Sequence, residues 1–433
     1  MSQGMEEWLV DSNEAVTIQL VRTSSDSEDL HDEEVRAIEP FHPAFTYPIF
    51  GELEKIFGYK GLEVKLSFAS GSLKTLLEIE YDSRLDPTSH TPPDDIEAAL
   101  YKFIPPDYTK SKDTFRDTVT EDAENFKPFG EKLGSYVRKR LSGAKEKGKG
   151  KGKGKGKGNG GTTNGKDERI DEELSEDSED AVVFETYRAT WETPGFREYH
   201  RRMQLFILLY IEGGSYVQED EDAWEFIILY ERRKRPESGL FTYHFVGYTS
   251  VYPFWCYPDS IRLRLSQFVV LPPYQGQGHG SQLYSTLFQH MLARAEVAEL
   301  TVEDPSEAFD ELRDRNDLRY LVKAGLMDDP KFLEGVGSGL RGERAKWELQ
   351  VRKKHKIAQR QFDRLLEMLL LKQLDRSDPA AVKAYRIQVK ARLYRFNYVS
   401  MFQSTPEERK EGLARTYDSV VEDYDRILEM TFG

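Results

Sequence analysis

The residues of this chain most suited to chemistry form one short glycine-rich segment, residues 271–280, which reads LPPYQGQGHG. A β-rich apolar run, residues 264–271, precedes it, and an amphipathic run, residues 281–292, follows it with Leu283 and Leu287 at helical spacing. This order predicts a strand, a glycine turn and then a helix. Because glycines let a backbone approach a ligand closely and the first amides of a helix lack intrahelical partners, the segment favours binding of a phosphate or diphosphate.

Phosphate-binding loops differ in their spacing, and the spacing here discriminates among them. A triphosphate-binding loop ends in Gly-Lys-Ser/Thr, which this segment lacks. A dinucleotide-binding loop reads GxGxxG, whereas this one reads GxGxG after two prolines, although Glu303 stands at a suitable distance for a ribose-binding acid. A turn without a ligand also stays open. The pattern Gln275-x-x-Gly278-x-Gly280, between a strand and a helix, resembles the diphosphate-binding motif Q/R-x-x-G-x-G/A of GNAT acetyltransferases.

Composition and charge narrow the class of protein. The chain has 433 residues, of which 38% are hydrophobic and 12% aromatic, so we expect about three domains of roughly 150 residues with packed cores. A formal net charge of −15 argues against a direct nucleic-acid partner. It suits a basic partner, and the alternative is that the charge only keeps the protein soluble. The single cysteine, Cys256, fits a reducing compartment, and the longest apolar run, residues 205–211, is too short to cross a membrane. Because the N-terminus lacks a signal pattern, we expect the cytosol or the nucleus.

Changes of pattern along the chain predict four regions. Residues 1–142 mix strand-like runs with a helix and predict an α+β domain. Residues 143–180 alternate Gly with Lys and then become strongly acidic, which predicts a disordered insert. Residues 181–325 surround residues 275–281 (the glycine loop) and predict the catalytic domain, and residues 326–433 predict a helical region with two apolar stripes.

Six segments, one of which covers most of the glycine loop, extend the resemblance from the GNAT superfamily to one family. They resemble, in the same order, segments of the type B histone acetyltransferase catalytic subunit. The resemblance runs through the N-terminal and central regions and, more weakly, the C-terminal helices, and it skips the insert. The segments are residues 57–61, 126–130, 195–200, 251–259, 271–280 and 302–306.

This resemblance implies an α+β fold of the GNAT type: a mixed, mostly antiparallel sheet flanked by helices, with an N-terminal α/β domain and a C-terminal helical region. It implies transfer of acetyl from acetyl-CoA, without a metal, to a lysine in the N-terminal tail of newly synthesised, unassembled histone H4. It also implies a WD40 histone-binding subunit as partner and residence in the cytoplasm and nucleus. Two alternatives stay open, namely a GNAT enzyme for another protein or a small amine, and a non-catalytic histone-binding chaperone.

Acetyl transfer to an amine requires a base, because a lysine amine with a pKa of about 10.4 arrives charged at neutral pH. The strand expected at residues 298–302 ends in Glu303 and Asp304. The resemblance assigns Glu303 as the general base, with Asp304 and Glu212 as nearby carboxylates that assist. Clustered carboxylates raise one another's pKa, which suits a base. The structural alternatives are a helix cap at Asp304 and a solvated helix end at Glu212.

The resemblance also assigns binding residues. Cofactor contacts fall on the glycine loop, the strand before it and two positions after Glu303: Gln275, Gly276, Gln277, Gly278, His279, Gly280 and Ser281; Phe268, Val269 and Val270; Ser306 and Arg315. We expect His279 to line the loop rather than act as a catalytic imidazole, and Ser306 departs from the asparagine of some relatives. Histone-tail contacts fall on an acidic and an aromatic segment, with a plain turn and strand packing as alternatives: Glu52, Leu53 and Glu54; Tyr252, Pro253 and Phe254.

The Gly-Lys run of the insert, residues 148–158, is similar in composition to the tail that this family acetylates. One hypothesis is that it reaches the active site as an autoacetylation target or a weak pseudosubstrate, since a flexible tether gives a local concentration of roughly millimolar. The alternative is a neutral linker.

Overall fold

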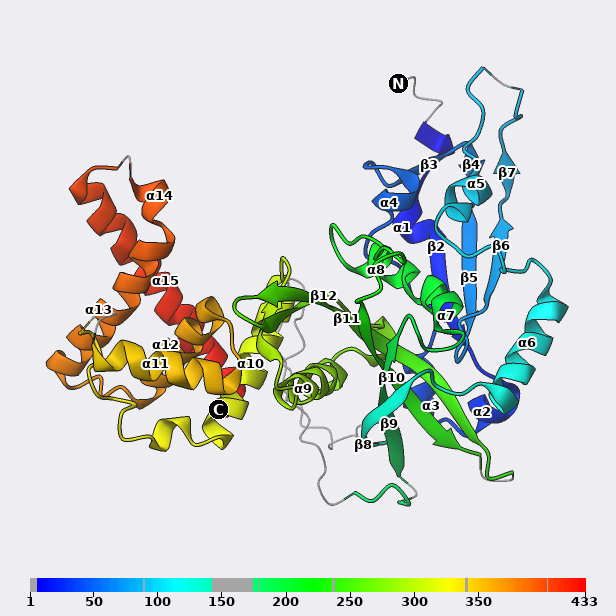
Figure 1. Cartoon of the computed structure of the whole chain (residues 1–433). Helices are drawn as coiled ribbons and strands as arrows, with labels where there is room; N and C mark the ends of the chain where they lie inside the picture. The colour runs from blue at the N-terminus through cyan, green and yellow to red at the C-terminus, as the bar shows by residue number, and fades with distance from the viewer. Residues whose placement is uncertain are drawn as a thin grey trace, which may run out of the picture. The chain divides into compact units, whose positions relative to one another are not determined.

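The structure is a computed structural model that describes residues 6–88, 90–141, 174–178, 180–235, 238–338, 342–402 and 404–433 (Figure 1). The chain divides into two compact units: unit 1 is Met1–Val251 with Gln267–Leu283, and unit 2 is Tyr252–Ser266 with Tyr284–Gly433. The Gly-Lys run lies outside the described residues. Its disorder and its acetylation therefore stay predictions, and so do the bounds of the four predicted regions.

In the described part of the chain, a six-stranded sheet has the order β13-β12-β11-β10-β9-β8. The pairs from β8 to β11 are antiparallel, whereas β12 and β13 are parallel. A parallel pair needs a crossover, which helix α9 (His279–Leu292) provides. The predicted mixed, mostly antiparallel sheet is thus confirmed. Its strands are β8 Glu131–Lys139, β9 Ala181–Thr190, β10 Glu225–Lys234, β11 Phe241–Cys256, β12 Ser260–Val270 and β13 Val297–Val302.

Strand β12 leads into the glycine loop and has one buried face. Leu263 and Leu265 are buried, and the residues between and after them, Arg264 and Ser266, are partly exposed. Because successive side chains of a strand point to opposite faces, Arg264 and Ser266 share the face away from the two leucines.

A second sheet, in unit 1, has three strands in the order β2-β5-β6. Strand β2 (Val16–Val21) is parallel to β5 (Glu63–Ala69), and β5 is antiparallel to β6 (Thr75–Glu80). Helix α6 (Lys112–Asn125) lies beside this sheet and packs Phe115 against Leu76 (Figure 1). The predicted N-terminal α/β region is therefore confirmed.

The stretch from Gly195 to Leu209 has a helix-like pattern that predicts one helix, but it forms two: α7 (Phe196–Met203) and α8 (Leu205–Tyr210). Five consecutive α8 residues, 205–209, are buried. A helix that is buried all round has no polar face, so its hydrophobic pattern cannot show where one helix ends and the next begins.

The remaining short elements of unit 1 precede β8. They are β1 Leu9–Asp11, α1 Ser12–Ala15, α2 Ser24–Glu28, α3 Asp32–Ala37, α4 Tyr47–Phe50, β3 Lys55–Phe57, β4 Tyr59–Lys60, β7 Ser83–Arg84 and α5 Ile96–Tyr101.

Strands β8 and β9 flank the insert and hold its two ends together. Just beyond the end of β8, the Arg140 N–H donates to the Asp180 carbonyl (2.8 Å). Glu176, in a described part of the insert, forms an ion pair with Arg232 of β10 (2.6 Å). The chain therefore leaves the sheet near residue 141 and has returned to the same strand pair by residue 180.

Unit 2 is helical after β13, which confirms the predicted C-terminal helical region. Helix α12 (Gln359–Gln373) buries the apolar stripe predicted for it, and α15 (Pro406–Phe432) buries Tyr424 and Ile427 of its own. Arg392 of α13 (Pro379–Phe396) donates to the Glu367 carboxylate of α12 (2.8 Å) and to the Tyr424 hydroxyl (2.9 Å). A buried polar cluster thus joins three helices. The other helices are α10 Glu307–Lys323, α11 Glu343–His355 and α14 Tyr398–Met401.

Within the described ranges, no helix has both the length and the apolar character needed to cross a membrane. The same part of the chain holds no group of three or more His, Cys, Asp or Glu side chains arranged to bind a metal ion.

Candidate functional site

Two glycines in the left-handed backbone region shape the glycine loop in unit 1. Gly276 has a φ of +72° and Gly278 a φ of +80°, values that other residues rarely adopt. A Cβ added at Gly276 would meet no atom within 4 Å, whereas one at Gly278 would collide with the Arg138 guanidinium. Helix α9 begins at His279, two residues before its expected start. The apolar pattern did not show this earlier start, because the first turn of the helix has no apolar residue. Its first amides therefore follow directly on the loop, where they and the helix dipole favour an anion.

The two glutamine side chains of the loop bond back to the chain before it. Gln275 Nε2 donates to the Val270 carbonyl (2.7 Å), and Gln277 Nε2 donates to the Pro273 carbonyl (2.9 Å). These bonds fix the course of the loop. The glutamines therefore have a shaping role that the motif alone does not reveal.

A β-bulge in β11 lies next to the end of β12. The register of the β10–β11 pair shifts and leaves Val246 without a partner in β10, and its carbonyl accepts the Leu271 N–H instead (2.9 Å). Val269 is buried, whereas Phe268 and Val270 are partly exposed. The structure thus places these three predicted cofactor contacts on the strand that enters the loop, and their role stays a prediction.

His279 is buried, with 1% of its surface exposed. Its Nδ1 lies 2.7 Å from the hydroxyl oxygen of Tyr136 on β8, and its ring centroid lies 4.2 Å from that of Phe184 on β9. Burial and, secondarily, the charge of Arg138 lower the pKa of His279 to about 3. The imidazole is therefore neutral at physiological pH and packed against the sheet, as a loop-lining residue would be.

Glu303 follows β13 in unit 2 and has a carboxylate that solvent can reach. Its N–H donates to the Leu265 carbonyl (2.9 Å), which extends the parallel pairing of β13 with β12 by one residue. Its Oε2 accepts the Ser266 hydroxyl (2.9 Å), and its Oε1 lies 3.7 Å from the Arg264 guanidinium. The side chain is 47% exposed. A carboxylate held this way is able to accept a proton from an incoming cationic group.

The residues that follow Glu303 form the start of α10. Asp304 is exposed and has a φ of +35°. The helix cap is Ser306, whose Oγ accepts the Phe309 N–H (3.3 Å), so the cap considered as the alternative role of Asp304 lies two residues later. Arg315, farther along α10, donates to the Met430 carbonyl (3.5 Å). The predicted cofactor contacts at Ser306 and Arg315 therefore also have structural roles within unit 2.

Two predicted carboxylates of unit 1 differ in their surroundings. Glu212 is exposed after the end of α8, and the N–H of the next residue, Gly213, donates to the Tyr47 hydroxyl (2.7 Å). Glu54 is committed to a turn, because its carboxylate accepts the N–H groups of Thr46 (2.7 Å) and Tyr47 (3.1 Å). Its neighbours Glu52 and Leu53 are exposed and free to meet a ligand.

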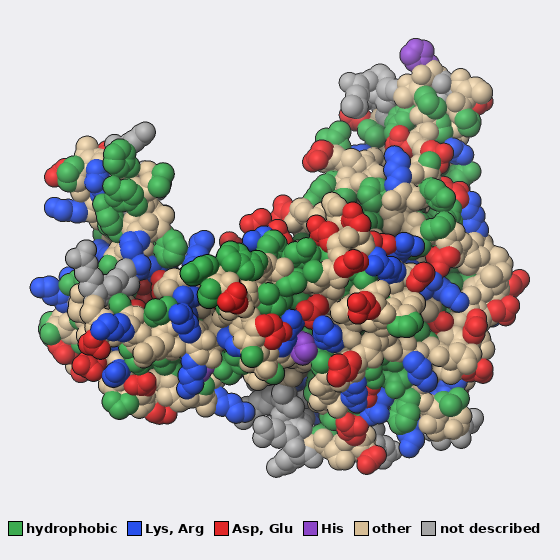
Figure 2. All heavy atoms as spheres, in the orientation of Figure 1, with side chains coloured by type: hydrophobic (Ala, Val, Ile, Leu, Met, Phe, Trp, Pro, Cys, Tyr) green, Lys and Arg blue, Asp and Glu red, His purple; other side chains and the backbone are tan. Residues whose placement is uncertain are grey.

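The predicted aromatic contacts lie toward the tip of the β11–β12 hairpin, in unit 2. The Tyr252 and Phe254 rings are 5.1 Å apart, and the Arg264 guanidinium carbon lies 4.3 Å from the centre of the Phe254 ring. Trp255 and Tyr257 beside them are 72% and 81% exposed. A group of hydrophobic side chains is visible over this tip in Figure 2.

Sequence reasoning missed the residues that support the site. Ser266 and Arg264 alternate with the buried residues of β12, and this alternation places them on one face, but only the pairing of β12 with β13 brings them to Glu303. No pattern in the sequence pointed to Arg138, because it lies 140 positions before Gly278, the loop residue that it contacts.

Comparison with known proteins first defines the class. A model of the acetyltransferase (GNAT) family matches residues 185–312, which include both the glycine loop and Glu303. With the mixed sheet and the loop at a helix N-terminus, this match makes the chain a GNAT acetyltransferase.

The particular family follows from matches along the rest of the chain. The models for the histone acetyl transferase HAT1 N-terminus and for the fungal HAT1 C-terminal region match residues 8–212 and 314–375. A histone acetyltransferase type B catalytic subunit from Cryptococcus neoformans var. neoformans serotype D is 65% identical over 433 residues, 100% of both chains. Those of Mycosarcoma maydis and Homo sapiens are 46% and 28% identical and cover 90% and 98% of this chain and 83% and 94% of their own. The chain belongs to the type B histone acetyltransferase catalytic subunits, and it is an acyltransferase.

Proposed function

We propose that the enzyme transfers acetyl from acetyl-CoA to the ε-amine of a lysine in the N-terminal tail of newly synthesised, unassembled histone H4. Transfer is direct, and Glu303 is the general base. The observation that carries the proposal is the setting of Glu303, a solvent-reachable carboxylate fixed by Ser266 and by the end of β13. The resemblance of six sequence segments to the family supports the choice of acceptor.

The glycine loop fits the diphosphate of acetyl-CoA. No atom lies within 4 Å of a Cβ placed at Gly276, so backbone there is open to a ligand, and the first amides of α9 follow within three residues. Residues 275–281 would hold the diphosphate, and Phe268 and Val270 would lie along the pantetheine arm. Acetyl-CoA, when bound, supplies the acetyl group as an activated thioester.

Glu303 removes the proton that gives the acceptor amine its positive charge. A lysine amine has a pKa of about 10.4 and must lose a proton before it attacks a thioester. Glu303 accepts that proton at one of its carboxylate oxygens, directly or through water, and base catalysis of this kind contributes about 10²–10⁴-fold. Asp304 and Glu212 assist as further carboxylates, which is the role that the resemblance to the family implies for them.

Exposed acidic and aromatic side chains would bind the histone tail. Glu52 and Leu53 are exposed on unit 1, and Tyr252 and Phe254 are partly exposed or exposed on unit 2. The formal net charge of −15 favours encounter with a basic tail. We further propose that a WD40 histone-binding subunit assists the enzyme and that it works in the cytoplasm and nucleus.

The test is to incubate the purified chain with labelled acetyl-CoA and an H4 N-terminal tail peptide, and to locate the label by mass spectrometry. We expect label on a tail lysine. A peptide with every lysine replaced by arginine is the matched control, because it keeps the charge but offers no amine. Binding of acetyl-CoA without label on the peptide would contradict the proposed acceptor.

A further inference from the structure

Strand β8, at the edge of the sheet, runs against the glycine loop in unit 1. Tyr136 and Arg138 are two residues apart on β8 and therefore share a face. Tyr136 contacts His279 through its hydroxyl (2.7 Å), and the Arg138 guanidinium abuts Gly278 so closely that a Cβ there would collide with it. Two consecutive loop residues are thus in contact with two side chains of one strand.

The charge of Arg138 acts on the loop. The Arg138 side chain is buried, with 8% of the residue exposed, so water screens its charge poorly. Its effect is seen at His279, whose pKa is lowered first by burial and then by Arg138. The loop itself, QGQGHGS, contains neither lysine nor arginine. Arg138 of β8 therefore places a side-chain cation directly beside Gly278 of the loop.

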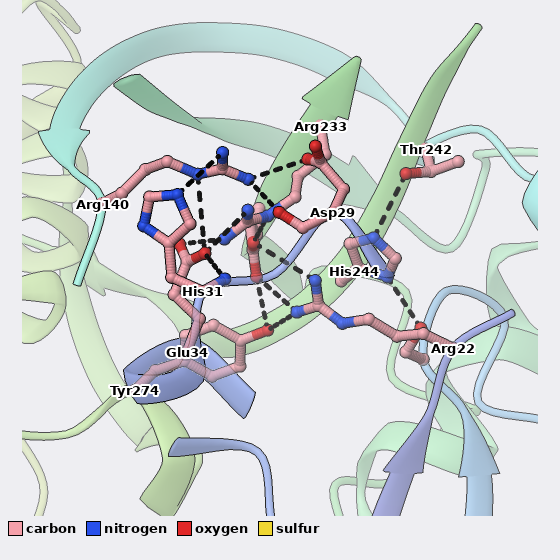
Figure 3. A network of polar contacts seen from close by, with 11 residues as sticks. Arg22, Asp29, His31, Glu34, Arg140, Arg233, Thr242, His244 and Tyr274 are labelled. Carbon is pink, nitrogen blue, oxygen red and sulfur yellow. Dashed lines mark hydrogen bonds and ion pairs between the residues drawn. The ribbon is translucent and has the colours of Figure 1, made fainter. Parts of the chain in front are cut away.

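The carboxylates near the start of the loop are neutralised by other arginines. Figure 3 shows this network, in which Glu231 accepts from Arg22 (2.6 Å) and from the hydroxyl of Tyr274 (2.8 Å), the residue before the loop. Glu231 also pairs with Arg233, which in turn pairs with Glu34 (2.6 Å). The buried negative charge here is therefore balanced within the network.

We propose that Arg138 is a binding residue for the diphosphate of acetyl-CoA, which supplies from strand β8 the positive charge that the glycine loop lacks. The inference rests on the proposed use of acetyl-CoA at this loop. In phosphate loops that end in Gly-Lys, the cation lies in the loop sequence itself. Here a neighbouring strand brings it to the loop, which is why the loop sequence alone does not reveal it.

The experiment separates binding of the diphosphate from all other effects. Isothermal titration with CoA measures affinity for a ligand that has the diphosphate, and turnover of S-acetylpantetheine measures the reaction with a donor that lacks it. For Arg138→Gln we expect the Kd for CoA to rise roughly tenfold or more, since charge-assisted hydrogen bonds to phosphate are among the strong ones. The KM and kcat with S-acetylpantetheine should stay within about twofold of the parent.

Lys139→Gln is the matched control, because it removes the same charge from the next, exposed position of β8, and its Kd for CoA should not change. If Arg138→Gln unfolds, Arg138→Lys keeps the charge with fewer donors and should show the same split at about threefold. Unchanged CoA affinity, or equal losses with CoA and S-acetylpantetheine, would overturn the role of Arg138. A parent chain that fails to bind CoA would instead reject the cofactor proposal itself.

Discussion

Glu303 takes its position from the backbone before its side chain makes any contact. Its N–H continues the ladder between β13 and β12, so the residue is fixed relative to Ser266 on the neighbouring strand. The Ser266 hydroxyl then orients one carboxylate oxygen, and the side chain stays about half exposed. A general base needs this combination, since it must be held still and yet be reached by the acceptor amine.

Replacing Glu303 by glutamine tests its role as base. Glu303→Gln keeps the shape and the hydrogen bond from Ser266 but cannot accept a proton, so we expect turnover to fall by at least about 100-fold. The Kd for acetyl-CoA, measured by titration, should remain within about twofold. Glu307→Gln, an exposed glutamate in the first turn of α10, is the control and should keep full turnover. A Glu303→Gln enzyme with most of its turnover would remove this residue from the mechanism.

At the scale of elements, the glycine loop works as a joint between β12 and α9. Its two left-handed glycines let the chain reverse, and its glutamines bond back to the residues before it. The loop is thus defined by backbone conformation, and substitutions should act according to what they do to that backbone.

Gly278→Asp should weaken binding of CoA by more than about tenfold, whereas Gln277→Ala should change it by less than about threefold. The aspartate strains a left-handed position, collides with Arg138 and adds negative charge beside a diphosphate. Titration with CoA measures the Kd of both variants. Gly239→Asp, at a left-handed and open position in the β10–β11 turn, is the control for backbone strain. Equal CoA affinity in the Gly278→Asp and parent proteins would place the cofactor elsewhere.

The sequence was sufficient for elements whose burial is one-sided. The apolar periods predicted β12 and α9, and the glycine spacing predicted the loop. The stripe of α12 was also predicted, although seven consecutive residues of that helix, 365–371, are buried. Periodicity could not divide α7 from α8, because the second helix is buried on every side. It also could not find Ser266 or Arg138, whose positions relative to the site depend on strand pairing between distant segments.

At the scale of the whole molecule, the two units contain buried titratable groups with opposite effects on stability. In unit 1, burial lowers the pKa of His200 to about 3, and the ring is packed among Trp191, Phe226 and Tyr248. The pKa of a histidine in the unfolded chain is about 6.5. When the folded state has a lower pKa, the contribution of the histidine to stability is present above about pH 6.5 and is lost as the pH falls below it. In unit 2, burial raises the pKa of Asp317 to about 6, so its stabilising effect is present in acid and lost as pH rises.

His200→Phe should make unit 1 less sensitive to acid. Between about pH 7.5 and about pH 5, protonation of the unfolded chain at this one histidine costs the parent about 2 kcal/mol of stability. The phenylalanine variant should escape that loss, whatever its stability at the higher pH. Urea unfolding at both pH values measures the difference, and His90→Phe, at an exposed position, is the control. An equal pH-dependent loss in parent and His200→Phe would contradict the buried, neutral state of this ring.

The joined ends of the insert have an evolutionary consequence. The bond between Arg140 and Asp180 closes the β8–β9 pair on the insert side, and Glu176 adds an ion pair to β10. Because these contacts close the strand pair, we expect residues gained or lost beyond them to leave the register of the strands unchanged. In a flexible loop, each doubling of length costs only about 0.6 kcal/mol in closure entropy. A change of chain length at this position would therefore leave β8 in place, and with it Tyr136 and Arg138, the two residues of this strand that contact the glycine loop.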